Sequence, residues 1–187
     1  MSAEALFEKL RSALDAAGIA YMVTGSFVSG VHGIPRATHD IDVVIAPTAD
    51  QLKALIAQFP QSEYYAEIED AREAFRHGSQ FNVIDQKSIW KIDFIFRKNR
   101  PFSRAEFERR RRITILGVPV YAASPEDVVI AKLEWAKMGE SERQIDDAAG
   151  IIEMQGDALD RAYIEHWVGE LSLGKQWTAA QERASAS

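Results

Sequence analysis

Two short apolar segments carry acidic residues where β-strands are expected. Asp40 and Asp42 flank Ile41 in the first segment, and Asp93 lies inside the second, residues 92–96. Neighbouring side chains of a strand point to opposite faces, so Asp40 and Asp42 share one face. A carboxylate that faces a core destabilises the fold by several kcal/mol unless it is paired, protonated or bound to a metal. The chain must therefore bring positive charge to these acids, and hard divalent cations such as Mg²⁺ prefer oxygen ligands of this kind.

A Gly25-Ser26 pair stands between a predicted strand, residues 19–24, and a predicted helix that begins at Phe27. Glycine permits close approach of the backbone to a ligand, and the free N–H groups at a helix N-terminus favour anions. The same dipeptide also marks ordinary turns. Its position ahead of the acid pair favours phosphate binding, with the Ser26 hydroxyl as a donor to a phosphate oxygen.

Composition excludes several classes of protein. The chain has 187 residues, 47% hydrophobic and 27% charged, as expected for one globular unit or a compact domain with a helical appendage. It has no cysteine, which excludes disulfides, thiolate zinc sites and a cysteine nucleophile and favours a reducing, cytoplasmic compartment. Charged residues interrupt residues 1–14 and no apolar stretch reaches membrane-spanning length, so we expect neither a signal peptide nor a membrane partner. The net charge of -6 argues against a surface built for non-specific DNA binding.

Apolar spacing and turn residues predict a mixed α/β half followed by a helical half. In the first half we expect helices over residues 3–17, 27–32, 50–59 and 66–76, and strands over residues 19–24, 40–45, 81–84, 88–96 and 113–121, the last as one strand or a pair broken at Gly117. In the second half, Ser124 and Pro125 predict the start of a helix that ends at Gly139, and further helices are expected from Ser141 and over residues 157–171. We predict an α/β domain over residues 1–122, a helical region packed on it over residues 123–187, and a frayed end over residues 182–187.

Together these motifs resemble the nucleotidyltransferase superfamily, whose fold is shared by DNA polymerase beta and aminoglycoside nucleotidyltransferases. The resemblance covers about residues 21–156 and rests on a Gly-Ser pair between a strand and a helix, an Asp-x-Asp on the next strand and a third Asp on a later strand. Residues 36–42 are similar to the small prokaryotic branch of AbiEii-like toxins and minimal nucleotidyltransferases. Residues 125–133, 141–144 and 146–147 resemble bacterial members of that branch. The implied fold class is α/β (α+β), a mixed β-sheet flanked by helices and followed by a C-terminal helical region.

The resemblance implies an enzyme that transfers a nucleoside monophosphate from a nucleoside triphosphate, with ATP as one candidate, to a hydroxyl of RNA, protein or a small molecule. Asp40, Asp42 and Asp93 would be catalytic and would hold Mg²⁺ as two ions, with Mn²⁺ as a substitute. The residues that would bind the nucleotide are Gly25, Ser26, Arg36, Thr38 and Lys132. The branch includes toxin–antitoxin systems, so a small antitoxin-type partner protein is also expected.

Several candidate positions keep a structural alternative. Lys132 lies among apolar residues of a predicted helix, and either reaches a triphosphate or snorkels to solvent. Arg36 either binds phosphate or balances the acids. Asp146 and Asp147 either form a solvated helix face, or one of them orients Lys132 or Arg143.

The run from Arg109 to Arg112 is the strong basic cluster of the sequence. It is either the solvated edge of an element or a contact for RNA or a nucleotide. His39 is expected to be structural, because its side chain faces away from that of Asp40. The tryptophans are expected to pack in the core or between helices rather than to stack on bases: Trp90, Trp135, Trp167 and Trp177.

Three functional hypotheses follow. The first is Mg²⁺-dependent nucleotidyl transfer, which uses all three strand acids. The second is a catalytically weak nucleotide-binding or antitoxin-type interaction module that keeps the fold. The third, RNA binding through the arginine run without chemistry, leaves the three acids unexplained.

Overall fold

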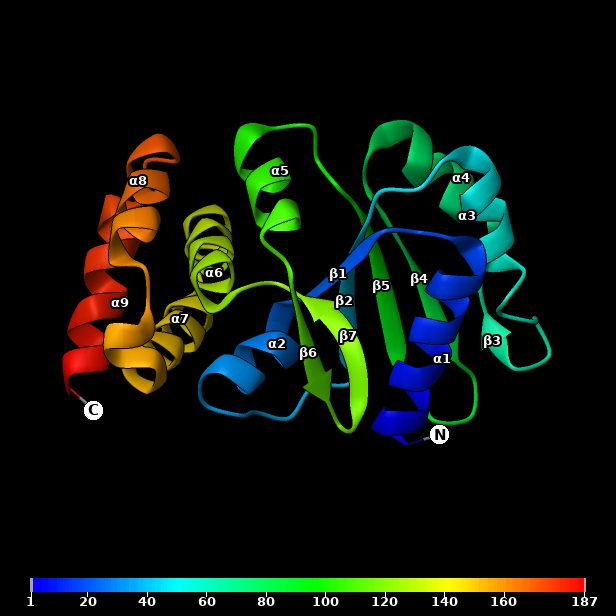
Figure 1. The fold of residues 1–187 in the computed structure, drawn as a ribbon, viewed down its shortest axis with the longest axis horizontal. Coiled ribbons are helices and arrows are strands. Elements are labelled where there is room, and N and C mark those ends of the chain that lie inside the picture. Colours follow the sequence, from blue (N-terminus) through cyan, green and yellow to red (C-terminus); the bar gives the residue numbers. More distant parts are fainter. Residues whose placement is uncertain (1, 187) are drawn as a thin grey trace. The chain divides into compact units, whose positions relative to one another are not determined.

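The computed structural model describes residues 2–186, which form two compact units (Figure 1). The first unit contains described residues 2–24 and 38–122, and the second contains described residues 25–37 and 123–186. The segment 25–37, with its Gly25-Ser26 pair, therefore belongs to the second unit although it interrupts the first in sequence. The predicted division into domains 1–122 and 123–187 stays a prediction, because compactness does not test whether a part folds independently.

The described residues of the first unit form a seven-stranded mixed sheet in the order β3-β4-β5-β2-β1-β7-β6. Its strands are β1 (Tyr21–Thr24), β2 (Asp40–Ile45), β3 (Tyr64–Tyr65), β4 (Gln80–Asp85), β5 (Lys91–Phe96), β6 (Arg111–Ile115) and β7 (Val118–Ala122). Its helices are α1 (Ala3–Ala17), α3 (Ala49–Ile56), α4 (Ile68–His77) and α5 (Pro101–Glu108). Helix α1 packs against α3 and β7, and α4 packs against β4. The predicted fold class, a mixed β-sheet flanked by helices, is confirmed.

The centre of this sheet is the parallel pair of β2 and β5. The register places Asp40 beside Lys91 and Asp42 beside Asp93. Side chains that are paired in this way leave the sheet on the same face, so the predicted acids come together from two strands. Ile41 alternates with them and is fully buried on the opposite face. Strand β2 has the predicted bounds because its acids and apolar residues alternate.

A turn centred on Asp85 connects β4 to β5 and fixes where β5 begins. The Asp85 N–H donates to the Trp90 carbonyl at 2.9 Å, and the buried Asp85 carboxylate accepts from the Lys87 N–H at 3.2 Å and from the Ser88 hydroxyl. Burial of Asp85 disfavours its charged form, but the hydrogen bonds from Ser88 and Lys87 outweigh burial and lower the pKa of Asp85. The Asp85 turn thus stabilises the hairpin that carries Lys91 and Asp93.

We expect Asp85→Asn to lower the free energy of unfolding by roughly 1–2 kcal/mol at pH 7, because its hydrogen bonds lose a charged acceptor. The pKa of Asp85 is lowered by folding, so this contribution is present above the unfolded pKa of about 3.9 and is lost as pH falls through the folded pKa. Urea unfolding of both proteins between pH 7 and the acid limit of the fold measures the difference. A difference that does not shrink toward acid would contradict the expectation.

The second unit is helical throughout its regular structure, as predicted for the C-terminal half. Its helices are α2 (Gly25–His32), α6 (Pro125–Gly139), α7 (Glu142–Gln155), α8 (Arg161–Glu170) and α9 (Gly174–Ala186), with a short 3-10 helix at Gly156–Ala158. The predicted start of α6 is confirmed: the Ser124 hydroxyl accepts from the Asp127 N–H at 3.2 Å, and Pro125 occupies the first turn. Ser141 precedes α7, but its side chain makes no capping hydrogen bond.

Helices α2 and α7 approach each other backbone to backbone. A Cβ atom added at Gly33, just beyond α2, would lie 2.8 Å from the Ile151 nitrogen of α7, closer than real Cβ contacts allow. Gly150 of α7 faces the Ile34 side chain. A Cβ atom added at Gly150 would lie 3.2 Å from Ile34 Cγ1. Two glycines therefore let α2 seat directly on α7.

Four sequence expectations differ from the structure. Helix α5 and the short strand β3 were not expected, and Trp135 is 57% exposed rather than packed in a core. By contrast, the region 113–121 is the antiparallel pair β6 and β7, so the predicted alternative of a pair broken at Gly117 is confirmed. The expected fraying is wrong for residues 182–186, which continue α9, while residue 187 lies outside the described residues. Within residues 2–186, no helix has both the length and the apolar character needed to cross a membrane.

Candidate active site

The three predicted acids lie together on β2 and β5 in the first unit. Asp93 is buried, with 7% of the residue exposed, whereas half of the Asp40 side chain is exposed. A lysine also lies among them: the Lys91 ammonium is 2.9 Å from Asp93 Oδ2 and 3.5 Å from Asp40 Oδ1. The hydrogen bond to Asp93, together with the charges of Asp93 and Asp40, raises the pKa of Lys91 against the opposing effect of burial. Lys91 is therefore the cation that accompanies this acid group.

The sequence prediction missed Lys91, although its spacing carried a signal. Residues 91 and 93 are two apart on one strand and so share a face. A lysine at the start of a strand normally points to water, so the residue type alone does not mark this position as part of a site. Because Lys91 pairs with Asp40 on the neighbouring parallel strand, the Lys91 side chain points toward the acid group.

The donor set fits a hard cation, and the clearest sign is one oxygen of Asp93. Asp93 Oδ1 is buried and has no hydrogen-bond partner, while Oδ2 accepts from Lys91. A buried carboxylate oxygen without a partner is costly and is the kind of ligand that Mg²⁺ takes up. As the side chains stand, residues 2–186 contain no group of three or more His, Cys, Asp or Glu arranged to hold a metal ion. The carboxylates of Asp40, Asp42 and Asp93 would have to turn toward a common point to bind one.

The second unit contains a charged cluster in which Asp147 joins three predicted nucleotide-binding residues: Ser26, Arg36 and Lys132. Asp147 of α7 accepts from Arg36 Nε at 3.1 Å, from Arg36 Nη2 at 3.3 Å and from Lys132 Nζ at 2.7 Å. Arg36 Nη2 also donates to the Ser26 hydroxyl oxygen, and Lys132 Nζ lies 3.5 Å from the same oxygen. Two cations and one carboxylate thus surround Ser26 at the start of α2.

The Ser26 hydroxyl is polarised by this arrangement. A serine hydroxyl has two acceptor lone pairs and one donor hydrogen. Because Arg36 and Lys132 both approach the oxygen, the hydroxyl hydrogen is directed elsewhere and is suited to donate to an anion. Gly25, immediately before it, has a φ of 71°, a backbone conformation that glycine adopts without strain. Glycine is therefore required at this turn for its backbone, in addition to any role in binding.

Lys132 does not snorkel to solvent. Its side chain is 6% exposed and the side chain of Asp147 is 8% exposed, so the two form a buried ion pair. Of the two adjacent aspartates considered from sequence, Asp147 is the one that orients Lys132. Asp146 instead pairs on the surface with Arg183, at 2.6 Å.

The adjacent aspartates provide a matched test of this cluster. We expect Asp147→Ala to lower the free energy of unfolding by about 3 kcal/mol or more, because it leaves two cations without their shared buried carboxylate. Asp146→Ala removes an exposed pair and should lower it by less than about 1 kcal/mol. Urea unfolding of both variants measures these values, and equal effects would show that Asp147 does not hold the cluster together.

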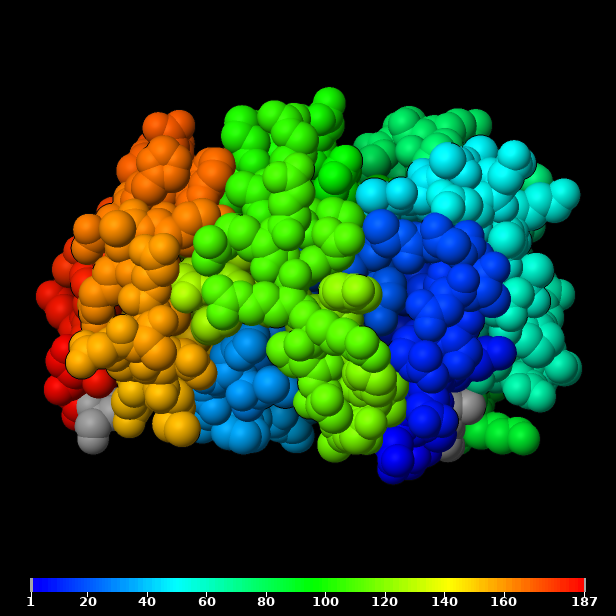
Figure 2. Space-filling view, in the orientation of Figure 1, coloured from blue at the N-terminus to red at the C-terminus, as the bar shows by residue number. Residues whose placement is uncertain are grey.

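Thr38 and Arg110, the second residue of the arginine run, have local structural partners. The Thr38 hydroxyl oxygen lies 3.3 Å from the Asp40 N–H and accepts from it, which fixes the start of β2. Arg110 packs on the Phe107 ring at 4.4 Å and donates to the Phe107 carbonyl oxygen. Arg111 and Arg112 are exposed on the edge strand β6, and the stretch that carries them (green) reaches the surface in Figure 2. The roles of Thr38 and of this run in binding stay predictions.

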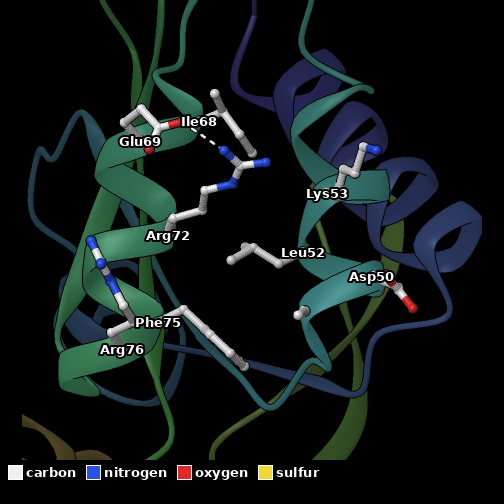
Figure 3. A pocket seen from close by; sticks show the side chains of 9 residues that line it. Asp50, Leu52, Lys53, Ile68, Glu69, Arg72, Phe75 and Arg76 are labelled. Atoms are coloured by element: carbon white, nitrogen blue, oxygen red, sulfur yellow. Dashed lines mark hydrogen bonds and ion pairs between the residues drawn. The ribbon is translucent and has the colours of Figure 1, made fainter.

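A hollow of about 360 Å³ lies elsewhere in the first unit, between α3 and α4 (Figure 3). Leu52 of α3 and Phe75 of α4 point into it, and Arg72 of α4 bonds to Glu69 at 2.6 Å along its rim. The full lining is Ala49, Asp50, Leu52, Lys53, Ile68, Glu69, Arg72, Phe75 and Arg76. None of these was predicted as a site residue, so the acid group on β2 and β5 is separate from this hollow.

Comparison with known proteins identifies the class of fold. No protein-family model matches the chain, and a search of curated proteins finds no match. Solved structures do match: the chain has a nucleotidyltransferase-like fold. At the level of identity found, these structures show the fold alone.

The particular structures are two of the antibiotic-resistance factor ANT(2'')-Ia and one of an antigenic nucleotidyltransferase-like protein. The solution structure of the antibiotic-resistance factor ANT(2'')-Ia is similar with a TM-score of 0.58 and 13% identity, over 98% of this chain and 97% of that chain. The crystal structure of ANT(2'')-Ia in complex with adenylyl-2''-tobramycin gives a TM-score of 0.56 and 13% identity, over 93% and 98%. An antigenic nucleotidyltransferase-like protein from Paracoccidioides brasiliensis gives 0.52 and 16%, over 94% and 92%. The predicted likeness to the AbiEii-like branch stays a prediction.

Proposed function

We propose that this chain is a Mg²⁺-dependent nucleotidyltransferase that moves a nucleoside monophosphate from a nucleoside triphosphate to a hydroxyl acceptor. The observation that carries the proposal is the register of Asp42 beside Asp93 on parallel strands, with a buried Asp93 oxygen that lacks a partner. A structural sheet residue would not need this arrangement, whereas phosphoryl chemistry depends on carboxylates that hold metal ions. The nucleotidyltransferase-like fold supports the same conclusion.

ATP is the first triphosphate to test. ANT(2'')-Ia, which has a similar fold, is in complex with adenylyl-2''-tobramycin in its crystal structure. That similarity supports adenylyl transfer here as a starting hypothesis. The acceptor is a hydroxyl of RNA, protein or a small molecule, and a toxin–antitoxin setting with a small antitoxin-type partner is part of the proposal.

In the proposed reaction, the acceptor oxygen forms a bond to the α-phosphorus, the bond from that phosphorus to the bridging oxygen breaks, and pyrophosphate leaves. Asp40, Asp42 and Asp93 would hold Mg²⁺, which supplies charge neutralisation at the phosphate oxygens when it is bound. Asp93 would help to hold the second metal ion and would accept the proton that the acceptor hydroxyl loses as its oxygen bonds to phosphorus. Ser26 donates to a phosphate oxygen, with Arg36 and Lys132 as further donors in the same cluster.

We expect Asp42→Ala to reduce label transfer from α-labelled ATP by roughly a hundredfold or more, because metal-ion stabilisation of the transferring phosphate contributes several kcal/mol. Asp50→Ala, which removes an exposed acid of α3, is the matched control and should keep full activity. Thermal melts establish that both variants fold. Transfer that is equally strong in Asp42→Ala would refute the assignment.

A second function, nucleotide binding with weak or no turnover, is favoured by the presence of Lys91 in the position of a cation. It predicts that ATP raises the melting temperature of the protein while no pyrophosphate is released with total RNA, cell protein or small-molecule acceptors. Pyrophosphate release that depends on Asp42 would decide for the transferase.

Ser26 provides a test of nucleotide binding by the second unit. We expect Ser26→Ala to raise the KM for ATP roughly tenfold, because one donor to a charged phosphate is lost. Ser29→Ala, on the same helix and with a buried side chain, is the control and should leave the KM unchanged. Steady-state pyrophosphate release measures both values, and a KM equal to that of the unmodified protein would remove Ser26 from the site.

A further inference from the structure

Lys91 is held by the sheet in a fixed relation to two of the acids. Its N–H donates to the His39 carbonyl oxygen at 3.0 Å, at the point where β5 joins β2. From that backbone position its ammonium contacts Asp93 on the same strand at 2.9 Å and Asp40 on the neighbouring strand at 3.5 Å. One side chain thus bridges carboxylates of two strands, which is what a metal ion at this place would do.

The Lys91 side chain combines strong contacts with access to water. One third of it is exposed, while Asp93, its nearer partner, is almost fully buried. An amphipathic lysine stem can stay packed while the ammonium moves into solvent, so leaving Asp93 would not strand a buried positive charge. Asp93 by contrast is almost fully buried, so a cation beside it stabilises its carboxylate, whether that cation is Lys91 or a metal ion.

We propose that the Lys91 ammonium is a resident counter-ion that competes with a divalent cation for the carboxylates of Asp93 and Asp40. This inference rests on the proposed function and concerns how the same site is regulated. Without metal, Lys91 compensates the acids and the sheet is stable. A divalent cation must displace the ammonium from Asp93, so Lys91 sets the metal concentration at which the site fills.

Mn²⁺ binding to the nucleotide-free protein tests this competition without any measurement of activity. The full chain and its Lys91→Met variant are titrated with Mn²⁺, and the EPR signal of free Mn²⁺ reports the bound fraction. Methionine keeps a stem of similar length and removes the charge, so Lys91→Met should bind Mn²⁺ roughly tenfold more tightly. Lys98→Met, which removes an exposed positive charge just beyond β5, is the matched control and should bind as the unmodified protein does.

Thermal melts give a second, independent readout. In EDTA, Lys91→Met should melt about 2–4 °C below the unmodified protein because its acids lack a counter-ion, and Mn²⁺ should remove this difference. Lys91→Arg keeps the charge and should show neither the lower melting temperature nor the tighter binding. Lys98→Met should melt at the same temperature as the unmodified protein, both in EDTA and in Mn²⁺.

The outcomes separate the inference from the proposed function. If the unmodified protein binds Mn²⁺ and Lys91→Met binds it no more tightly, the competition is refuted while the metal site stands. If neither protein binds Mn²⁺ at concentrations that saturate ordinary carboxylate sites, both the competition and the metal-dependent function are refuted. Tighter binding by Lys91→Met and Lys98→Met alike would assign the effect to net charge and would also refute a specific role for Lys91.

Discussion

The first unit depends on how its central sheet accommodates negative charge. The parallel register of β2 and β5 sets Asp42 beside Asp93, and because Asp93 is buried, a cation beside it stabilises the fold. The Asp85 turn fixes the start of β5 and with it the position of Lys91. Either an ammonium or a metal ion can supply the positive charge that these acids attract.

The two units solve the problem of charge burial in opposite ways. In the first, one ammonium, that of Lys91, lies between two carboxylates. In the second, one carboxylate, that of Asp147, lies between the cations of Arg36 and Lys132. The first arrangement attracts further cations, and the second attracts anions.

Sequence patterns predicted what depends on local periodicity and missed what depends on pairing. Strand β2 was predicted within its bounds because its acids alternate with apolar residues, and the start of α6 was predicted from Ser124 and Pro125. Lys91 was missed because its contact with Asp40 is made across a strand pair that no single segment encodes. Helix α5 was missed because its buried Phe102 and Phe107 are five residues apart, a spacing that does not repeat along one helical face. The exposure of Trp135 could not be foreseen either, since α6 has apolar residues around most of its circumference and which ones are covered depends on its neighbours.

The path of the chain between the units has a consequence for how this protein can vary. Residues 25–37 belong to the second unit, so the backbone passes from one unit to the other three times, after residues 24, 37 and 122. Helix α2 is seated on α7 through the close contact of Gly33 with Ile151. A fragment that ends at residue 122 would therefore keep α2 and lose the helix on which it rests. Neither unit is one contiguous stretch of coding sequence, so recombination at a single breakpoint cannot exchange one for a homologous counterpart, and the two are constrained to be inherited together.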